Sequence, residues 1–302
     1  MTRPSGESPK AILALSAASL LWGASFIAMK GAMLAYSPML IVFARMALGA
    51  ALMLWLLRRE GGAVPLRKDI KIFAFMTLCE PCLYFTLEAN ALQYTQAAQA
   101  GMVTAMLPLM VTAAAAVILK ERMGARGVAG LVLAVAGVIL LSLAAEETQS
   151  APNPLLGNFL EFLAMVCAAG YILAAKVLGR RYSPLYLTTA QACAGAVFFS
   201  PALLFSPAPE RFPLVPSLCI VFLAVGVTYT AYVLYNYGVS KVDASRASVF
   251  INLIPVITVI LSWIFLGERL FPAQYAGAAV VFLGVYLSAK PSGSSRQSTR
   301  GE

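Results

Sequence analysis

Few side chains in this sequence can do chemistry, and those few lie inside long apolar runs. The charged residues that interrupt such runs are Arg45, Glu80, Glu88 and Glu161. A charged side chain at the centre of a membrane-spanning helix costs at least ~2.5–3.5 kcal/mol on insertion scales, so each one needs a partner or a ligand. Ionisable groups in this setting predict a polar site for a small charged molecule.

Aromatic and amide side chains accompany these charges. Glu80, Tyr84 and Glu88 recur at every fourth residue, which places them on one face of a helix. We expect Tyr84, Tyr232 and Asn236 to supply stacking and hydrogen bonds. The remaining residues that we expect to line the site are Trp22, Lys30 and Asn252.

The charges suit a ligand that carries both a carboxylate and an amine. Arg45 or Lys30 would hold the carboxylate, since both side chains donate charge-assisted hydrogen bonds. Glu88 or Glu161 would hold the amine. The alternative is that Arg45 forms a structural ion pair with Glu88 or Glu161.

Proton transfer must rely on carboxyl groups, because the chain contains no histidine. Glu80 or Glu88 is the natural carrier of a coupling proton, and we assign the role to Glu80. The alternative for Glu80 comes from Pro81, which follows it: the side chain would then satisfy backbone groups freed by a proline kink.

Composition indicates an all-α membrane protein. Hydrophobic residues make up 60% of the 302 residues, charged residues 12%, and the mean hydropathy is +0.81. Soluble domains carry roughly a quarter charged residues. The net charge of +9 is spread over segment ends and does not indicate nucleic-acid binding. We expect no cofactor and no metal site.

Ten segments are long and apolar enough to span a membrane, which takes about 20 residues. They are 11–30, 38–57, 71–92, 97–119, 127–145, 156–178, 185–205, 215–238, 245–266 and 273–289.

The basic residues predict the orientation of these spans. With the N-terminus inside, nearly all of the 22 Lys and Arg residues fall in cytoplasmic segments; the exceptions are Lys30, Arg45, Arg211 and Arg269. Positively charged loops stay in the cytoplasm. We therefore expect both termini on the cytoplasmic side of a bacterial inner membrane.

The sequence repeats itself. KERMGARGVAG at 120–130 returns as GERLFPAQYAG at 267–277, and Pro108 recurs as Pro255. Five spans per copy is an odd number, so the second copy must be inverted in the membrane. The predicted organisation is an N-terminal segment, a first repeat, a linker, a second repeat and a disordered tail: 1–10, 11–145, 146–155, 156–289 and 290–302.

Several of these residues also carry a family resemblance. Trp22-Gly23-Ala24-Ser25-Phe26, then Arg45, then Pro108, Glu121-Arg122 and Gly130, with their second copies at Pro255, Glu268-Arg269 and Gly277, resemble the EamA-like family of the drug/metabolite transporter superfamily. The resemblance covers residues 11–289. It implies a ten-helix inner-membrane transporter, often an exporter of amino acids or related metabolites.

The function expected from these observations is secondary transport by alternating access, in the direction of export. No nucleotide-binding motif is present, so an ion gradient, with protons as the candidate ion, or substrate exchange would drive it. A channel-like passive facilitator is the alternative, and an intramembrane enzyme is a remote one. The expected partners are a small molecule and membrane lipid, and the chain is expected to act as a monomer or a homodimer.

Overall fold

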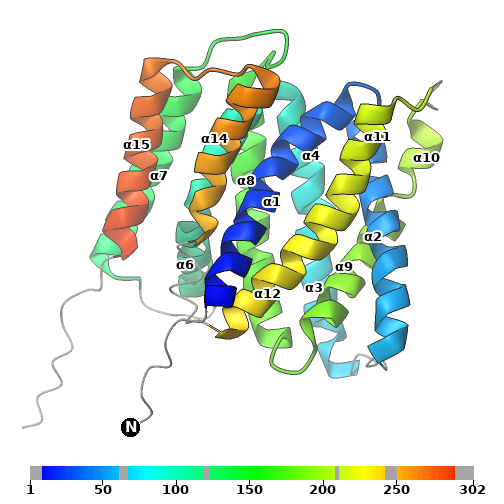
Figure 1. Cartoon of the computed structure of the whole chain (residues 1–302). Helices are drawn as coiled ribbons and strands as arrows, with labels where there is room; N and C mark the ends of the chain where they lie inside the picture. The colour runs from blue at the N-terminus through cyan, green and yellow to red at the C-terminus, as the bar shows by residue number, and fades with distance from the viewer. Residues whose placement is uncertain (1–8, 61–66, 119–122, 208–210, 242–249, 290–302) are drawn as a thin grey trace, which may run out of the picture.

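The computed structural model describes residues 9–60, 67–118, 123–207, 211–241 and 250–289, and these residues form an α-helical bundle (Figure 1). Eight of its helical spans are long and apolar enough to cross a membrane, and two shorter apolar helices complete the set. The predicted all-α membrane protein with ten spans is confirmed. The expected disordered tail at 290–302 lies outside the described residues.

The first five spans follow one another along the chain. They are α1 (Pro9–Met33); α2 (Pro38–Glu60); the third span, made of η1 (Arg67–Asp69), α3 (Ile70–Thr77), η2 (Leu78–Leu83) and α4 (Tyr84–Tyr94); the fourth, made of α5 (Ala97–Val103), η3 (Thr104–Met106) and α6 (Leu107–Ile118); and α7 (Ala125–Leu143).

The second five spans repeat this order. They are α8 (Pro154–Leu178); α9 (Pro184–Phe199) with the short α10 (Ala202–Phe205); the eighth span, made of α11 (Leu214–Val221), η4 (Phe222–Ala231) and α12 (Tyr232–Lys241); α14 (Leu253–Leu266); and α15 (Pro272–Ala289).

Capping residues in the sequence start two of these helices. The side chain of Asn153 accepts a hydrogen bond from the backbone N–H of Leu156, and Ser183 does the same for Tyr186. A proline follows each cap, at the first helical position, where its missing N–H costs nothing.

Contacts between the two halves come in pairs that a two-fold axis would generate. Helix α1 packs against α14, and α8, its counterpart, packs against α6. Likewise α1 packs against α12, and α8 against α4. The helices α2 and α9 pack together, as do α7 and α15, which lie side by side in Figure 1. The two five-helix repeats therefore have inverted topology, as predicted.

Glycines set the contact between α7 and α15. A Cβ atom on Gly130 would lie 2.5 Å from the carbonyl oxygen of Gly284, and one on Gly137 would lie 2.8 Å from that of Gly277. Gly130 corresponds to Gly277 and Gly137 to Gly284 in the repeat, so the two contacts are copies of each other. Small residues allow helix backbones to approach this closely in a membrane.

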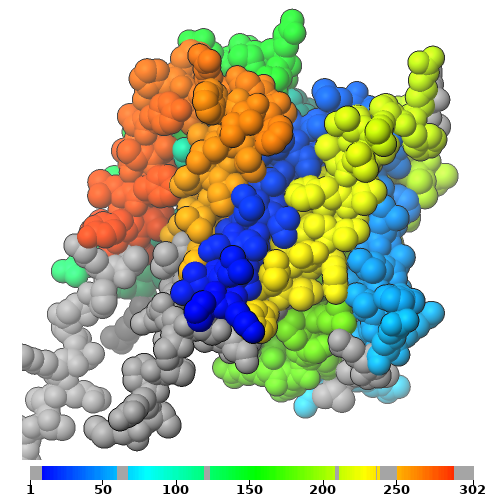
Figure 2. Space-filling model, viewed as in Figure 1, coloured from blue at the N-terminus to red at the C-terminus, as the bar shows by residue number. Residues whose placement is uncertain are grey.

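The outward surface of the bundle is apolar. Large hydrophobic side chains such as Leu204 (82% exposed), Phe205 (85%) and Val117 (80%) point away from the protein. Figure 2 shows the side chains of α1, α11, α12 and α14 covering one face of the bundle. Apolar exposure on this scale fits lipid rather than water, and the chain is an integral multi-pass membrane protein.

Candidate functional site

Glu80 lies where the third span departs from helical geometry. Its backbone has φ −146° and ψ 120° inside the π-helical turn η2, directly before Pro81. Proline removes a helix hydrogen bond, so nearby backbone groups need other partners. Gln191 on α9 supplies one: its Nε2 donates to the carbonyl oxygen of Glu80 at 3.2 Å. This hydrogen bond joins the two repeats.

The carboxyl group of Glu80 has a different partner. It accepts a short hydrogen bond from the hydroxyl of Tyr232 on α12, again across the repeats. The alternative in which the Glu80 side chain satisfies the kinked backbone is therefore wrong for this structure. The ring of Tyr232 meets Trp22 on α1 edge-on with 5.4 Å between centroids, and Trp22 also packs on Tyr235 at 4.9 Å.

Arg45 on α2 reaches the second repeat from the other side. Its side chain is buried, and Nε and Nη2 donate to Oγ1 of Thr228 on η4 at 3.2 and 3.1 Å. The guanidinium carbon lies 4.3 Å from the ring centroid of Phe85, a cation–π distance. No hydrogen bond joins Nη1 to any described residue.

The expected ion pair of Arg45 with Glu88 or Glu161 is not formed. The only ion pair among the described residues joins Arg181 and Asp69. The reason is the wide turn in the second repeat: within η4 the hydroxyl of Thr228 bonds to the carbonyl of Leu223 and presents its oxygen to Arg45.

The two other carboxyl groups differ in their partners. Glu88 on α4 is buried and accepts a hydrogen bond from the hydroxyl of Tyr84 at 2.7 Å, one turn earlier on the same helix. Glu161 on α8 is fully buried, and neither of its oxygens has a hydrogen-bond partner. The predicted face of Glu80, Tyr84 and Glu88 is thus split, because η2 turns Glu80 toward Tyr232.

A pocket between the repeats joins several of these groups. Its walls include Glu80 and Phe85 from the first repeat and Gln191, Thr228 and Tyr232 from the second. Its volume is about 10 Å³, which is roughly the space that one water molecule requires. The structure therefore leaves room for about one water molecule at this site and none for a substrate.

Of the predicted site residues, Glu80 and Tyr232 line this pocket, and the others lie outside its lining or lack a described side chain. Lys30 lies in the last turn of α1, and its Nζ donates to the carbonyl oxygen of Ser150 in the linker at 2.8 Å. Asn252 precedes α14, and its Oδ1 is buried without a partner. Asn236 lies on α12, and its side chain is outside the described part of the structure.

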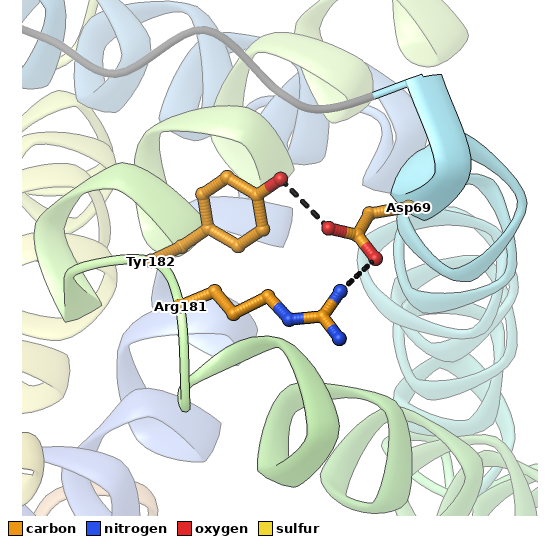
Figure 3. Close-up of polar contacts among 3 residues, drawn as sticks. All are labelled: Asp69, Arg181 and Tyr182. Atoms are coloured by element: carbon orange, nitrogen blue, oxygen red, sulfur yellow. Dashed lines mark hydrogen bonds and ion pairs between the residues drawn. The ribbon is translucent and has the colours of Figure 1, made fainter.

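Polar contacts tie the repeats together at the end of the bundle where the third span begins, here called the Asp69 end (Figure 3). Nη1 of Arg181 lies 2.6 Å from Oδ1 of Asp69, and the hydroxyl of Tyr182 donates to Oδ2 at 2.9 Å. Arg181 and Tyr182 belong to the connection between α8 and α9. Asp69 thereby fastens the first repeat to the second.

The opposite end, here called the Lys30 end, is fastened by neutral groups and a capping carboxylate. The hydroxyls of Tyr36 and Ser217 are 2.6 Å apart, and Ser37 donates to Ser206 at 2.7 Å. The carboxylate of Glu268 accepts from the backbone N–H groups of Ala97 and Ala98 at 3.1 and 2.9 Å, which caps α5 across the repeats. Glu268, one of the residues that carry the family resemblance, therefore has a structural contact in this structure.

Sequence reasoning missed some members of the site. Asp69 and Phe85 were not among the residues that the sequence singled out. Gln191 had a usable signal, since it falls at the repeat position of Arg45, 146 residues later.

Inverted repeats that meet at a closed, charged site are the architecture of membrane transporters that work by alternating access. The chain belongs to the EamA-like transporter family: the sequence model of that family matches residues 9–143 and again residues 155–290. It is a transporter, and the resemblance drawn from its motifs is confirmed.

Individual relatives agree with this assignment. The uncharacterized transporter YyaM of Bacillus subtilis is 30% identical over 88% of this chain and 89% of its own length. A "Probable terminal-alkyne amino-acid exporter" of Streptantibioticus cattleyicolor is 24% identical over 92% and 93%. A solved crystal structure matches with a TM-score of 0.63 and 21% identity over 92% of this chain and 97% of the other, which shows the shared fold.

Proposed function

We propose that this protein is a secondary transporter that exports a small amino-acid-like compound by alternating access. The observation that carries the proposal is the state of Arg45: a buried guanidinium at the interface of the repeats, held by one hydroxyl and one ring, with no ion pair to a carboxylate among the described residues. A guanidinium that lacks a carboxylate partner in a dry interior is suited to bind the carboxylate of a ligand.

The other groups fit the rest of such a ligand. Glu88, held in place by Tyr84, would accept the amine. Trp22 and Tyr232 would pack against its apolar part, with Asn236 and Asn252 as hydrogen-bonding groups. Lys30, at one end of the bundle, would attract the carboxylate at the entrance rather than hold it at the centre.

We assign proton coupling to Glu80. Its carboxyl group is shared with Tyr232 of the other repeat, so a change in its protonation would alter a contact that holds the repeats together. Because the pocket admits about one water in the closed state, a bound substrate requires the repeats to separate. That requirement favours a carrier over a channel.

The amino-acid relationship has support from one relative, which is named a probable terminal-alkyne amino-acid exporter. The test starts with a thermal-shift screen of purified protein against amino acids, peptides, polyamines and nucleobases. Compounds that raise the Tm are then tested for counterflow in liposomes. The proposal predicts that an unlabelled amino-acid-like compound inside draws the labelled one in. Flux without exchange would indicate a channel, and no stabilising amino-acid-like compound would overturn the substrate class.

We also propose that both termini are cytoplasmic, in the cell membrane of a bacterium. The asymmetry of Lys and Arg supports this orientation. A reporter active only in the periplasm should stay silent when fused after Glu302 and should work when inserted within 146–155. The opposite result would reverse the orientation.

A further inference from the structure

Glu161 is a carboxyl group that the closed structure leaves without a partner. It lies on α8, its side chain is 0% exposed, and neither Oε1 nor Oε2 accepts a hydrogen bond. Among the described residues it is the one carboxyl group with both oxygens in this condition. An ionised carboxylate there would lose its hydration and gain no compensating contact, which makes the ionised form very unfavourable.

The isolation of Glu161 is not a general property of this part of α8. One turn earlier, Asn158 is equally buried, and its Nδ2 donates to both Gln99 and Ser142 at 3.0 Å. Its Oδ1 accepts from the hydroxyl of Thr95 at 2.8 Å. The buried side chain of Asn158 therefore has hydrogen-bond partners, whereas the carboxyl group of Glu161, three residues later on the same helix, has none.

The neighbours of Glu161 make a negative charge there still less favourable. Glu88, a second buried carboxyl group, lies on α4, which packs against α8, and Tyr84 on α4 donates its hydroxyl to Glu88 rather than to Glu161. The helices α5 and α6, which also pack against α8, contain no ionisable residue. The other charged residues on elements that pack against α8 are Glu80 on η2, Lys71 on α3 and Arg126 on α7.

No cation neutralises Glu161 within the described structure. Arg45 donates to Thr228, and the ion pair formed between described residues is at the Asp69 end. Two carboxyl groups that share a dry region cannot both stay ionised, because the repulsion between them is not screened. One of the pair must bind a proton, and the group without any hydrogen-bond donor is Glu161.

We propose that Glu161 is a proton-binding site, occupied while the repeats are closed and vacated when they part. The step is a simple proton transfer: when α4 and α8 separate, water enters, the O–H bond of the carboxylic acid breaks, and the proton passes to that water. A hydrated carboxylate remains on Glu161. The site is distinct from Glu80, and it rests on the proposed function only for the parting of the repeats.

The proton on Glu161 can be observed without knowing the substrate. Infrared spectra of purified protein in detergent at neutral pH should contain the carbonyl stretch of a protonated carboxylic acid that exchanges slowly in D₂O. The band should disappear in Glu161→Gln and persist in the matched variant Glu80→Gln. Carboxylate stretches in place of that band, lost in Glu161→Gln, would overturn the proposal.

A second variant, Glu161→Met, tests the proposal even if Glu161→Gln does not fold. A neutral, partnerless acid should be replaceable by an apolar side chain of similar length, so Glu161→Met should keep or raise the Tm. A fall in the Tm of Glu161→Met that matches the fall caused by Asn158→Leu would show instead that Glu161 makes stabilising polar contacts, which contradicts the proposal.

A transport assay then separates this inference from the proposed function. With a pH-sensitive dye inside proteoliposomes, Glu161→Gln should move fewer protons for each substrate molecule than the wild type does, while counterflow persists. An unchanged number of protons would overturn the inference. Absence of counterflow in the wild type would count against the proposed function and leave the infrared result standing.

Discussion

The two repeats share a backbone plan but contribute different chemistry. Both third helices contain a π-helical turn at corresponding positions, η2 at Leu78–Leu83 and η4 at Phe222–Ala231. A shift of 146 residues places Gln191 opposite Arg45 and Gly226 opposite Glu80. At these two positions the first repeat thus supplies the charged groups Arg45 and Glu80, where the second has the neutral residues Gln191 and Gly226.

This difference distinguishes the residues that hold the fold together from those proposed to bind the ligand. The pairing of helices and the glycine contacts obey the two-fold relation, and the proposed alternating access would move both repeats in the same way. A ligand with a carboxylate and an amine has no such symmetry, so its binding groups need not obey it. Changes in symmetric positions should therefore affect folding, and changes in asymmetric positions should affect transport.

The largest effect is expected from the symmetric glycine contacts. Gly137→Leu and Gly284→Leu, at corresponding positions of the two contacts, each force a side chain against the facing backbone, and overpacking costs ~1–3 kcal/mol or more. Both variants should lose most of their membrane abundance, and to a similar degree. Val132→Leu, on the lipid-facing side of α7, is the control and should behave as the wild type. Unequal losses would mean that the two contacts are not equivalent.

The second-largest effect is expected from Arg45→Gln. It places in the first repeat the residue that the second repeat already has, so folding should be retained. Transport should fall about 10- to 100-fold, because a hydrogen bond to a charged group contributes ~1.5–3 kcal/mol. Uptake or efflux is measured at matched abundance. Normal transport, or lost abundance with normal activity per molecule, would make Arg45 a structural residue.

Glu80→Gln should have a more selective effect. The amide can still accept the hydrogen bond from Tyr232 but cannot exchange a proton, so transport should continue with a flattened dependence on pH. Glu88→Gln is the comparison: it should weaken substrate binding and keep the pH profile. A pH profile in Glu80→Gln that follows the wild type would remove Glu80 from the coupling step.

The smallest effect is expected at the Asp69 end. Arg181 is 49% exposed, and ion pairs with exposed partners add little. Asp69→Asn keeps an acceptor for Tyr182 and loses the ion pair, so the Tm should fall slightly at low salt and not at high salt. Ser37→Ala, at the Lys30 end, should show no such salt dependence. A large fall in the Tm of Asp69→Asn at every salt concentration would contradict this weak, charge-based contact.

Much of the scaffold could be predicted from the sequence. Long apolar runs gave the spans, although the third extends over Arg67–Tyr94 rather than 71–92, because charged residues at a membrane surface can still be helical. The recurrence of Pro108, Glu121 and Gly130 in the second half indicated the duplication, and the odd number of spans in each copy indicated the inversion.

The partners inside the site could not be predicted in the same way. Arg45 donates hydrogen bonds to Thr228 rather than to a carboxylate because the π-helical segment η4 widens the helix at that point. No residue type in the sequence predicts a π-helical turn there. Asp69 pairs with Arg181 across the repeats, a contact that depends on the angle between helices rather than on spacing in the sequence.

The central claim is that the repeats part at one end and close at the other in each transport cycle. The most direct test introduces Ser37→Cys and Ser206→Cys together at the Lys30 end, in a background whose native cysteines are replaced, because their hydroxyls are 2.7 Å apart. Counterflow of the compound found by thermal shift is measured with the pair oxidised and then reduced. The account predicts that oxidation stops counterflow and that reduction restores it. Full counterflow in the oxidised protein would contradict alternating access.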